Sequence, residues 1–111
     1  MTWAMNLHSE PFDSIKNGHK DIEMRLFDDR RKGIKIGDTI VFTNNVTQEK
    51  LYVEVVNLYR FDNFEELYQH FDKTRLGYSE TGIANPKDME KYYSKDNILR
   101  YGVLGIEIKL K

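Results

Sequence analysis

The amino-acid sequence predicts an α+β domain, a small β-barrel of about five or six mostly antiparallel strands with three short helices. Short segments of alternating apolar and polar residues, typical of half-buried strands, are interrupted by segments with helical spacing. The N-terminal and C-terminal segments are both strand-like, so we expect them to pair and close the barrel. With 111 residues, 40% hydrophobic and 32% charged, the chain fits one compact domain over residues 1–111.

The first elements follow directly from this pattern. Residues Trp3–Leu7 alternate in part and predict a strand. Ser9 is a good helix N-cap, and Gly18 stands where a glycine ends a helix, so we expect a helix over Glu10–Asn17. Apolar residues then recur at every second position of Ile22–Leu26, which predicts a strand with Glu23 and Arg25 on its other face. Lys20 is expected in the turn before this strand.

The middle of the chain predicts a hairpin followed by a helix. Thr39–Phe42 and Lys50–Tyr59 are β-rich and are separated by polar turn residues. Asp62 or Asn63 is expected to cap the helix that contains Phe64, Leu67, Tyr68 and Phe71, because Asp62 and Glu65 have capping-box spacing.

The last third is less regular. No periodicity is visible over Arg75–Pro86, which we expect to be a mobile loop that could fold over a site. A short helix is expected over Pro86–Tyr93, and Gly102–Leu110 predicts a closing strand in which Gly105 marks a bulge.

Composition excludes several classes of function. The chain has no cysteine, and its three histidines lack the spacing of a metal site, so we expect neither a metal nor a cofactor. It has no signal-peptide pattern and no apolar run of the roughly 20 residues that span a bilayer, so we expect a cytoplasmic protein without a membrane partner. The formal net charge of −1 argues against nonspecific coating of nucleic acid.

Charge is nevertheless uneven along the chain. Residues Arg25–Lys35 contain five basic and two acidic residues, a local charge of +3, whereas Phe61–Asp72 carries −4. Two interpretations stay open: a mixed solvated surface, or a local anion site suited to one phosphate or a short strand. Arg30, Arg31 and Lys32 are expected in a solvated turn that could contact phosphate.

The most informative motif is G-x-K-x-x-E-x-R, formed by Gly18, Lys20, Glu23 and Arg25. Lys20 beside a carboxylate is favoured as a fixed cation that holds a phosphate or polarises a carbonyl, rather than as a nucleophile. Glu23 and Arg25 could form a structural ion pair, or Glu23 could accept from an exocyclic amino group while Arg25 orients it.

Aromatic residues outside the motif extend the candidate site. Tyr92 and Tyr93 could provide a stacking platform and Ser94 a hydroxyl for a base, although packing of one tyrosine in the core is equally ordinary. Tyr78 carries the same ambiguity. Among the histidines, only His19 is a candidate acid–base group, because it lies inside the motif.

These residues resemble the ASCH family, small domains with a PUA-like β-barrel, and look like a bacterial subgroup of stand-alone ASCH proteins. The likeness covers essentially the whole chain. Besides the motif, it rests on Pro11-Phe12-x-x-Ile15-x-x-Gly18, Arg25-Leu26-x-Asp28, Gly37-Asp38-x-Ile40-x-Phe42, Phe64-x-x-Leu67, Tyr92-Tyr93-Ser94 and Tyr101-Gly102-Val103-x-Gly105-Ile106.

The resemblance implies binding of RNA or a modified nucleoside in a cleft beside the motif, contacted by Lys20, Glu23, Arg25, Tyr92, Tyr93 and Ser94. One bacterial branch of the family deacetylates N4-acetylcytidine with the motif lysine in its catalytic group, which corresponds to Lys20. That branch has threonine where this chain has Glu23. Two alternatives therefore stay open: a small amidohydrolase or ribonuclease using Lys20 and Glu23, and a regulatory interaction module that binds no nucleotide.

Overall fold

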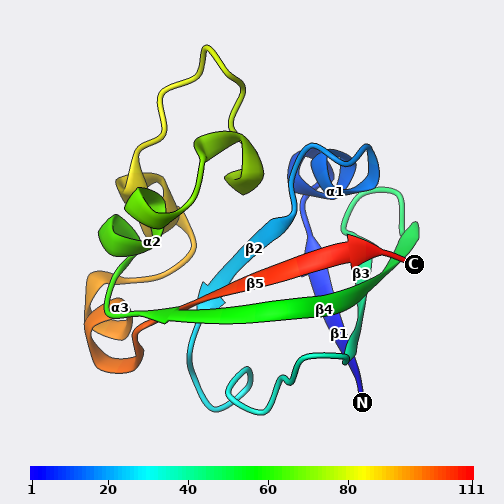
Figure 1. The fold of residues 1–111 in the computed structure, drawn as a ribbon, viewed down its shortest axis with the longest axis horizontal. Helices are drawn as coiled ribbons and strands as arrows, with labels where there is room; N and C mark the ends of the chain where they lie inside the picture. The colour runs from blue at the N-terminus through cyan, green and yellow to red at the C-terminus, as the bar shows by residue number, and fades with distance from the viewer.

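The computed structural model describes all of residues 1–111 and shows one five-stranded sheet, curled into a half-barrel (Figure 1). The strands lie in the order β1-β3-β4-β5-β2. In chain order the elements are β1 (Thr2–Leu7), α1 (Ser9–Lys16), β2 (Ile22–Leu26), β3 (Thr39–Asn44), β4 (Lys50–Phe61), α2 (Phe64–His70), the 3-10 helices η1 (Lys73–Leu76) and η2 (Pro86–Lys91), α3 (Lys95–Tyr101) and β5 (Val103–Leu110).

The barrel is open, and the predicted pairing of the terminal strands is wrong. β1 pairs in parallel with β3, whereas β5 lies between β4 and β2 and is antiparallel to both. α1 and β2 form part of the connection from β1 to β3, the kind of long crossover that a parallel pair requires. β1 and β2 are therefore the two edges of the sheet, and we call the gap between them the open seam.

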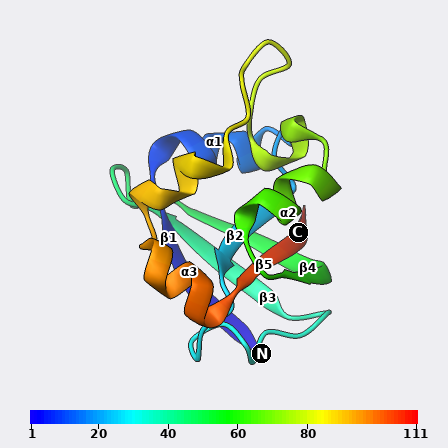
Figure 2. The same cartoon turned by 90° about the vertical axis from the view of Figure 1, so that its left-hand side faces the viewer.

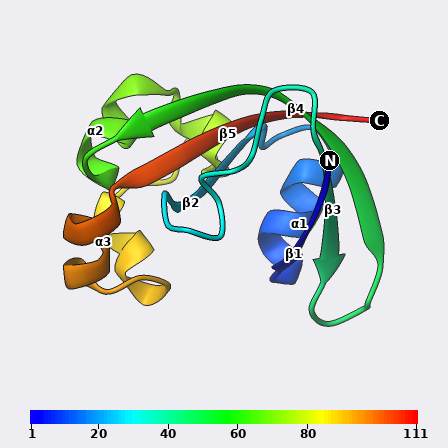
Figure 3. The same ribbon diagram turned by 90° about the horizontal axis from the view of Figure 1, so that it is seen from below.

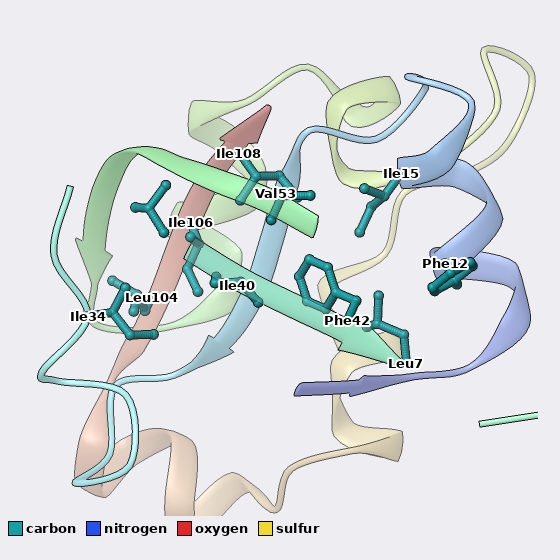
Figure 4. Packing of buried hydrophobic residues seen from close by; sticks show 11 residues of the cluster. Leu7, Phe12, Ile15, Ile34, Ile40, Phe42, Val53, Leu104, Ile106 and Ile108 are labelled. Carbon is teal, nitrogen blue, oxygen red and sulfur yellow. The ribbon is translucent and has the colours of Figure 1, made fainter. Parts of the chain in front are cut away.

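The inner face of the sheet holds the larger hydrophobic core. Seen from below, the sheet curves around α1 (Figure 3). Phe12 and Ile15 of α1 share this core with Phe42 of β3, and alternate strand residues together with Ile34, from the loop between β2 and β3, complete the cluster (Figure 4). This cluster comprises Leu7, Phe12, Ile15, Ile34, Ile40, Phe42, Val53, Val55, Leu104, Ile106 and Ile108. The core thus fixes the helix that precedes the motif against the sheet.

A second core lies on the outer face, where the helices of the second half of the chain cover β2 and β5 (Figure 2). Its members are Ile22, Met24, Leu26, Phe64, Leu67, Phe71, Leu76, Met89 and Val103. β2 is consequently covered on both faces. The alternation of its residues predicted burial of the apolar face but not of the face that carries Glu23 and Arg25. No helix of the domain is long and apolar enough to cross a membrane.

Gly105 does not mark a bulge. It pairs regularly with Met24 and Tyr59, and the register shift lies in β4 between Val55 and Asn57. A side chain at position 105 would lie 3.4 Å from Phe71 and 3.5 Å from Leu67, so the glycine allows α2 to approach the sheet closely.

Helix termini account for the other local differences. His8, not Ser9, is the N-cap of α1, and the Ser9 hydroxyl donates to Asn44 Oδ1 at 3.0 Å. Asn63 rather than Asp62 caps α2, accepting from the Glu66 amide at 2.9 Å. These are local competitions between neighbouring polar residues, which tertiary contacts decide.

Helix α3 is absent from the predicted elements, although the predicted short helix at Pro86 is confirmed as η2. No residue of α3 is fully buried, and the two that pack against the outer core, Ile98 and Tyr101, form too short an apolar pattern to identify a helix from sequence.

Replacing Leu67 with alanine should lower the free energy of unfolding by about 2–5 kcal/mol, because Leu67 is fully buried between α2 and the sheet. Urea denaturation measures this change. Leu99→Ala is the matched control, because Leu99 is 86% exposed, and should change stability by no more than about 0.5 kcal/mol. Equal effects of the two substitutions would contradict the assigned outer core.

Candidate functional site

The motif begins where α1 ends and enters the sheet along an edge strand. The Lys20 amide donates to the carbonyl of Ser14 at 2.9 Å, which folds the turn back onto α1. Strand β2 starts at Ile22, so the prediction that Lys20 lies in the preceding turn is confirmed. Glu23 and Arg25 lie opposite Ile106 and Leu104 of β5, which places both on the inner face.

Three charged side chains form a buried network on this face. The Lys20 ammonium lies 3.0 Å from Glu23 Oε1. Arg25 donates to Glu23 Oε2 through Nε at 3.0 Å and through Nη2 at 2.8 Å. The side chains of Lys20 and Glu23 are only 8% and 4% exposed, so both oxygens of the carboxylate are held by cations away from solvent.

Glu23 remains ionised despite its burial. Removal from water raises the pKa of a carboxyl group, but the charges and hydrogen bonds of Lys20 and Arg25 outweigh this and lower the pKa of Glu23 to about 2. The network therefore contains two positive charges and one negative charge.

Arg25 also connects the two edges of the sheet. Its Nη2 atom donates to the carbonyl oxygen of Asn6 in β1 at 3.1 Å. β1 and β2 form no backbone ladder with each other, so this guanidinium bridges the open seam in place of main-chain hydrogen bonds.

The aliphatic stem of Lys20 lies against Gly77, which follows η1. A Cβ at position 77 would lie 3.2 Å from Lys20 Cδ. Gly77 also has a φ of +106°, a backbone conformation that residues with a side chain rarely adopt. Glycine at this position thus lets the chain cover Lys20 and hold its ammonium beside Glu23.

A cleft of about 340 Å³ opens beside this network, and we call it the motif cleft. Its walls come from the end of β1, from α1, from the motif, from the turn after β3 and from the segment that runs from α2 to Tyr93. The residues that line it are Asn6, Leu7, His8, Glu10, Pro11, Ser14, Lys20, Glu23, Met24, Arg25, Asn45, Tyr68, Leu76, Gly77, Tyr78, Asp88, Met89, Lys91, Tyr92 and Tyr93.

Most residues predicted for the site meet in this cleft. Lys20, Glu23 and Arg25 line it together with Tyr92 and Tyr93. The two tyrosines differ: Tyr92 is 55% exposed, whereas Tyr93 stacks on Phe64 in the outer core, with ring centroids 6.2 Å apart. Burial raises the pKa of Tyr93, which keeps its phenol neutral beside Arg25.

Other predicted candidates lie elsewhere. Ser94 does not line the cleft: it caps α3, accepting from the Asn97 amide at 3.1 Å. His19 also lies outside, with its ring 2.9 Å from the carbonyl oxygen of Tyr78. In the turn after β2, Arg31 pairs with Asp28 and Lys32 with Asp29.

Sequence reasoning named Tyr78 as a candidate but missed the polar wall that it forms with Tyr68 and Asp88. Tyr78 donates to Asp88 at 2.7 Å, and the Tyr68 hydroxyl lies 2.9 Å from that of Tyr78. Burial and these hydrogen bonds raise the pKa of Tyr78. Tyr78 belongs to the base of the expected Arg75–Pro86 loop, so only the base of that loop borders the cleft. The helical spacing of Tyr68 indicates packing, and only the fold brings Tyr78 between Tyr68 and Asp88.

His8 is the other residue that sequence reasoning missed. It follows β1 directly, lines the cleft, and lies with its ring centroid 6.0 Å from that of Tyr92. Its position at a strand end beside the motif helix was the signal that could have identified it. No three His, Cys, Asp or Glu side chains lie close enough together to hold a metal ion.

The chain belongs to the ASCH domain family, whose model matches residues 5–110. The fold predicted from the resemblance is thereby confirmed: a PUA-like sheet, here an open half-barrel. No curated protein matches the chain.

Two solved structures are similar to this chain over essentially their whole length. The crystal structure of hypothetical protein PH0355 has 30% identity and a TM-score of 0.81, with 100% of both chains covered. The solution structure of protein PF0455 from Pyrococcus furiosus has 31% identity and a TM-score of 0.71, covering 99% of this chain and 97% of that one. The likeness to a bacterial subgroup stays an expectation.

The ASCH domain from Lactobacillus crispatus JV V101 shares the fold at 15% identity, with a TM-score of 0.66 and coverage of 97% of this chain and 79% of that one. At that identity, the comparison speaks for the fold alone.

Replacing Glu23 with glutamine should destabilise the domain by about 3–5 kcal/mol at neutral pH, because it leaves two buried cations without a counter-charge. A lowered folded-state pKa stabilises the protein above the unfolded value near 4.5, and this stabilisation is lost as pH falls toward 2. The difference between wild type and variant should therefore shrink over that range, measured by urea unfolding at several pH values. Glu80→Gln, in an exposed loop, should show no such difference.

Replacing Gly77 with alanine should destabilise the protein more than Gly37→Ala, by about 1 kcal/mol or more. Both glycines have positive φ, +106° and +93°, so the backbone strain is matched. Only position 77 has a neighbour, since a Cβ there meets the Lys20 stem and one at position 37 meets nothing within 4 Å. Thermal or urea unfolding of both variants measures the difference; equal losses would show that Gly77 serves the turn alone.

Proposed function

We propose that this ASCH domain binds one nucleotide unit, as part of single-stranded RNA or as a modified nucleoside, in the motif cleft. The observation that carries the proposal is the cleft itself, about 340 Å³ in volume, with the Lys20–Glu23–Arg25 network in its wall. That volume lies at the small end of the range for ligand pockets, roughly 300–1,000 Å³, which suits a single base with its sugar.

The charges around the cleft favour a base and sugar over a run of phosphates. Three cations and three carboxylates line it: Lys20, Arg25 and Lys91, and Glu10, Glu23 and Asp88. A surface that binds nucleic acid mainly through phosphates carries a large positive excess, which this cleft lacks. Donors and acceptors on facing walls instead match the polar edge of a nucleobase.

Within the network, Lys20 is the group that retains N–H donors for a ligand. An ammonium has three N–H donors, and its contact with Glu23 uses one of them. The remaining donors can reach a carbonyl or phosphate oxygen of a ligand. Because its stem is packed against Gly77, the ammonium is held in place before a ligand arrives, which lowers the entropic cost of binding.

The geometry favours binding over catalysis by Glu23. A general base at neutral pH works best with a pKa near 7, whereas that of Glu23 is about 2. Both of its oxygens are already held by Lys20 and Arg25. Glu23 acts in this proposal as the counter-ion that positions two cations.

Lys20→Ala should weaken binding of short single-stranded RNA and of nucleosides at least about 10-fold, because a buried charged hydrogen bond is lost. Isothermal titration calorimetry or NMR titration with both classes of ligand measures this. Lys109→Ala, an exposed residue outside the cleft, is the control and should leave affinity unchanged.

The same titrations separate the alternatives. The wild-type chain could release acetate from N4-acetylcytidine or cleave the RNA. If Lys20→Ala abolished that activity, the protein would be an enzyme and not a binding domain alone. Absence of binding and turnover with every probe would favour an interaction module without a nucleotide ligand.

A further inference from the structure

The mouth of the motif cleft holds two aromatic rings that the polar network does not use. The rings of His8 and Tyr92 lie with centroids 6.0 Å apart and planes inclined by 36°. Both residues are exposed and line the cleft. Neither side chain forms a hydrogen bond within the protein, in contrast to Tyr59, Tyr68 and Tyr78, whose hydroxyl groups are all bonded.

The two rings come from different walls of the motif cleft, since His8 follows β1 and Tyr92 follows η2. His8 lies two residues after Asn6, whose carbonyl oxygen accepts from Arg25. Tyr92 precedes Tyr93, which lines the cleft together with Arg25. Arg25 thus holds the chain next to His8, and both exposed rings belong to the cleft that Arg25 lines.

The spacing of the rings is close to that needed to hold a third ring between them. Bases in a nucleic acid stack lie about 3.4 Å apart, so a base between two rings requires centroids about 7 Å apart. The observed 6.0 Å needs an increase of about 1 Å and a reduction of the tilt. Rotamer changes of exposed side chains on the picosecond-to-nanosecond timescale supply movements of this size.

We propose that His8 and Tyr92 form an aromatic clamp that sandwiches the base of the bound nucleotide. This inference rests on the proposed function and deepens it: the ligand is a nucleotide whose base is stacked at the cleft mouth, beside the donors of Arg25 and Lys20. Every base has a π-face, so the clamp provides affinity without strong sequence preference. Selection among bases then falls to the polar walls of the cleft.

The clamp is tested by comparing ligands with and without a base. The probes are the four nucleoside 5′-monophosphates and ribose 5-phosphate, titrated against the wild-type chain by NMR. Wild type should bind at least one nucleotide about 10-fold more tightly than ribose 5-phosphate, since stacking of a base contributes that order of affinity. Base protons should shift upfield on binding, because they enter the ring currents of the clamp.

In His8→Ala and Tyr92→Ala, the ratio of the two affinities should fall toward one, whereas affinity for ribose 5-phosphate should stay unchanged. Tyr92→Phe retains the ring and should preserve the ratio. Tyr52→Ala is the matched control, because Tyr52 is 52% exposed against 55% for Tyr92 and lies outside the cleft.

An unchanged ratio in both His8→Ala and Tyr92→Ala, with binding still lost in Lys20→Ala, would overturn the clamp and leave the proposed function standing. A wild-type chain that binds none of the four nucleotides would overturn the clamp, and the proposed function would fall with it only if short single-stranded RNA and nucleosides also fail to bind. A change in affinity for ribose 5-phosphate as large as that for nucleotides would assign the two rings a structural role instead.

Discussion

The carboxylate of Glu23 is the interaction on which the site depends. It lies on the inner face of an edge strand and holds the cations of Lys20 and Arg25 on its two oxygens. Burial alone would neutralise such a carboxyl group, and burial of either cation without it would be costly. Together the three charges stabilise one another, and each is placed by the other two.

This network also explains why the half-barrel can stay open. An edge strand normally presents unpaired backbone groups to solvent, and here two edges face each other without a ladder between them. Arg25 crosses the gap to the Asn6 carbonyl, so the edges are tethered by a side chain. The space that a fifth pairing, between β1 and β2, would have filled becomes the motif cleft, and the same residues serve the fold and the site.

Local sequence patterns predicted most of the strands and helices and the shared face of the motif residues, but they did not predict the long-range contacts of the site. The alternation over Ile22–Leu26 correctly predicted β2 and the shared face of Glu23 and Arg25, because side-chain direction in a strand has period two. The contact from Arg25 to Asn6 depends on which strands become edges, which no local pattern records. The sequence predicts Ser94 as a ligand-binding hydroxyl, because α3, which it caps, has no fully buried residue and only Ile98 and Tyr101 half-buried against the outer core.

The parallel pairing of β1 with β3 affects when the site forms during folding. Its two strands are separated by α1 and β2, and Thr2 pairs with Thr39, so this contact closes a long loop. Contacts between residues distant in the chain slow folding, because the entropy of loop closure is lost before they form. The motif lies inside that loop, and the opposite wall of its cleft comes from residues 68–93. The cleft is thus complete only after most of the chain has been organised, which makes ligand binding a readout of finished folding.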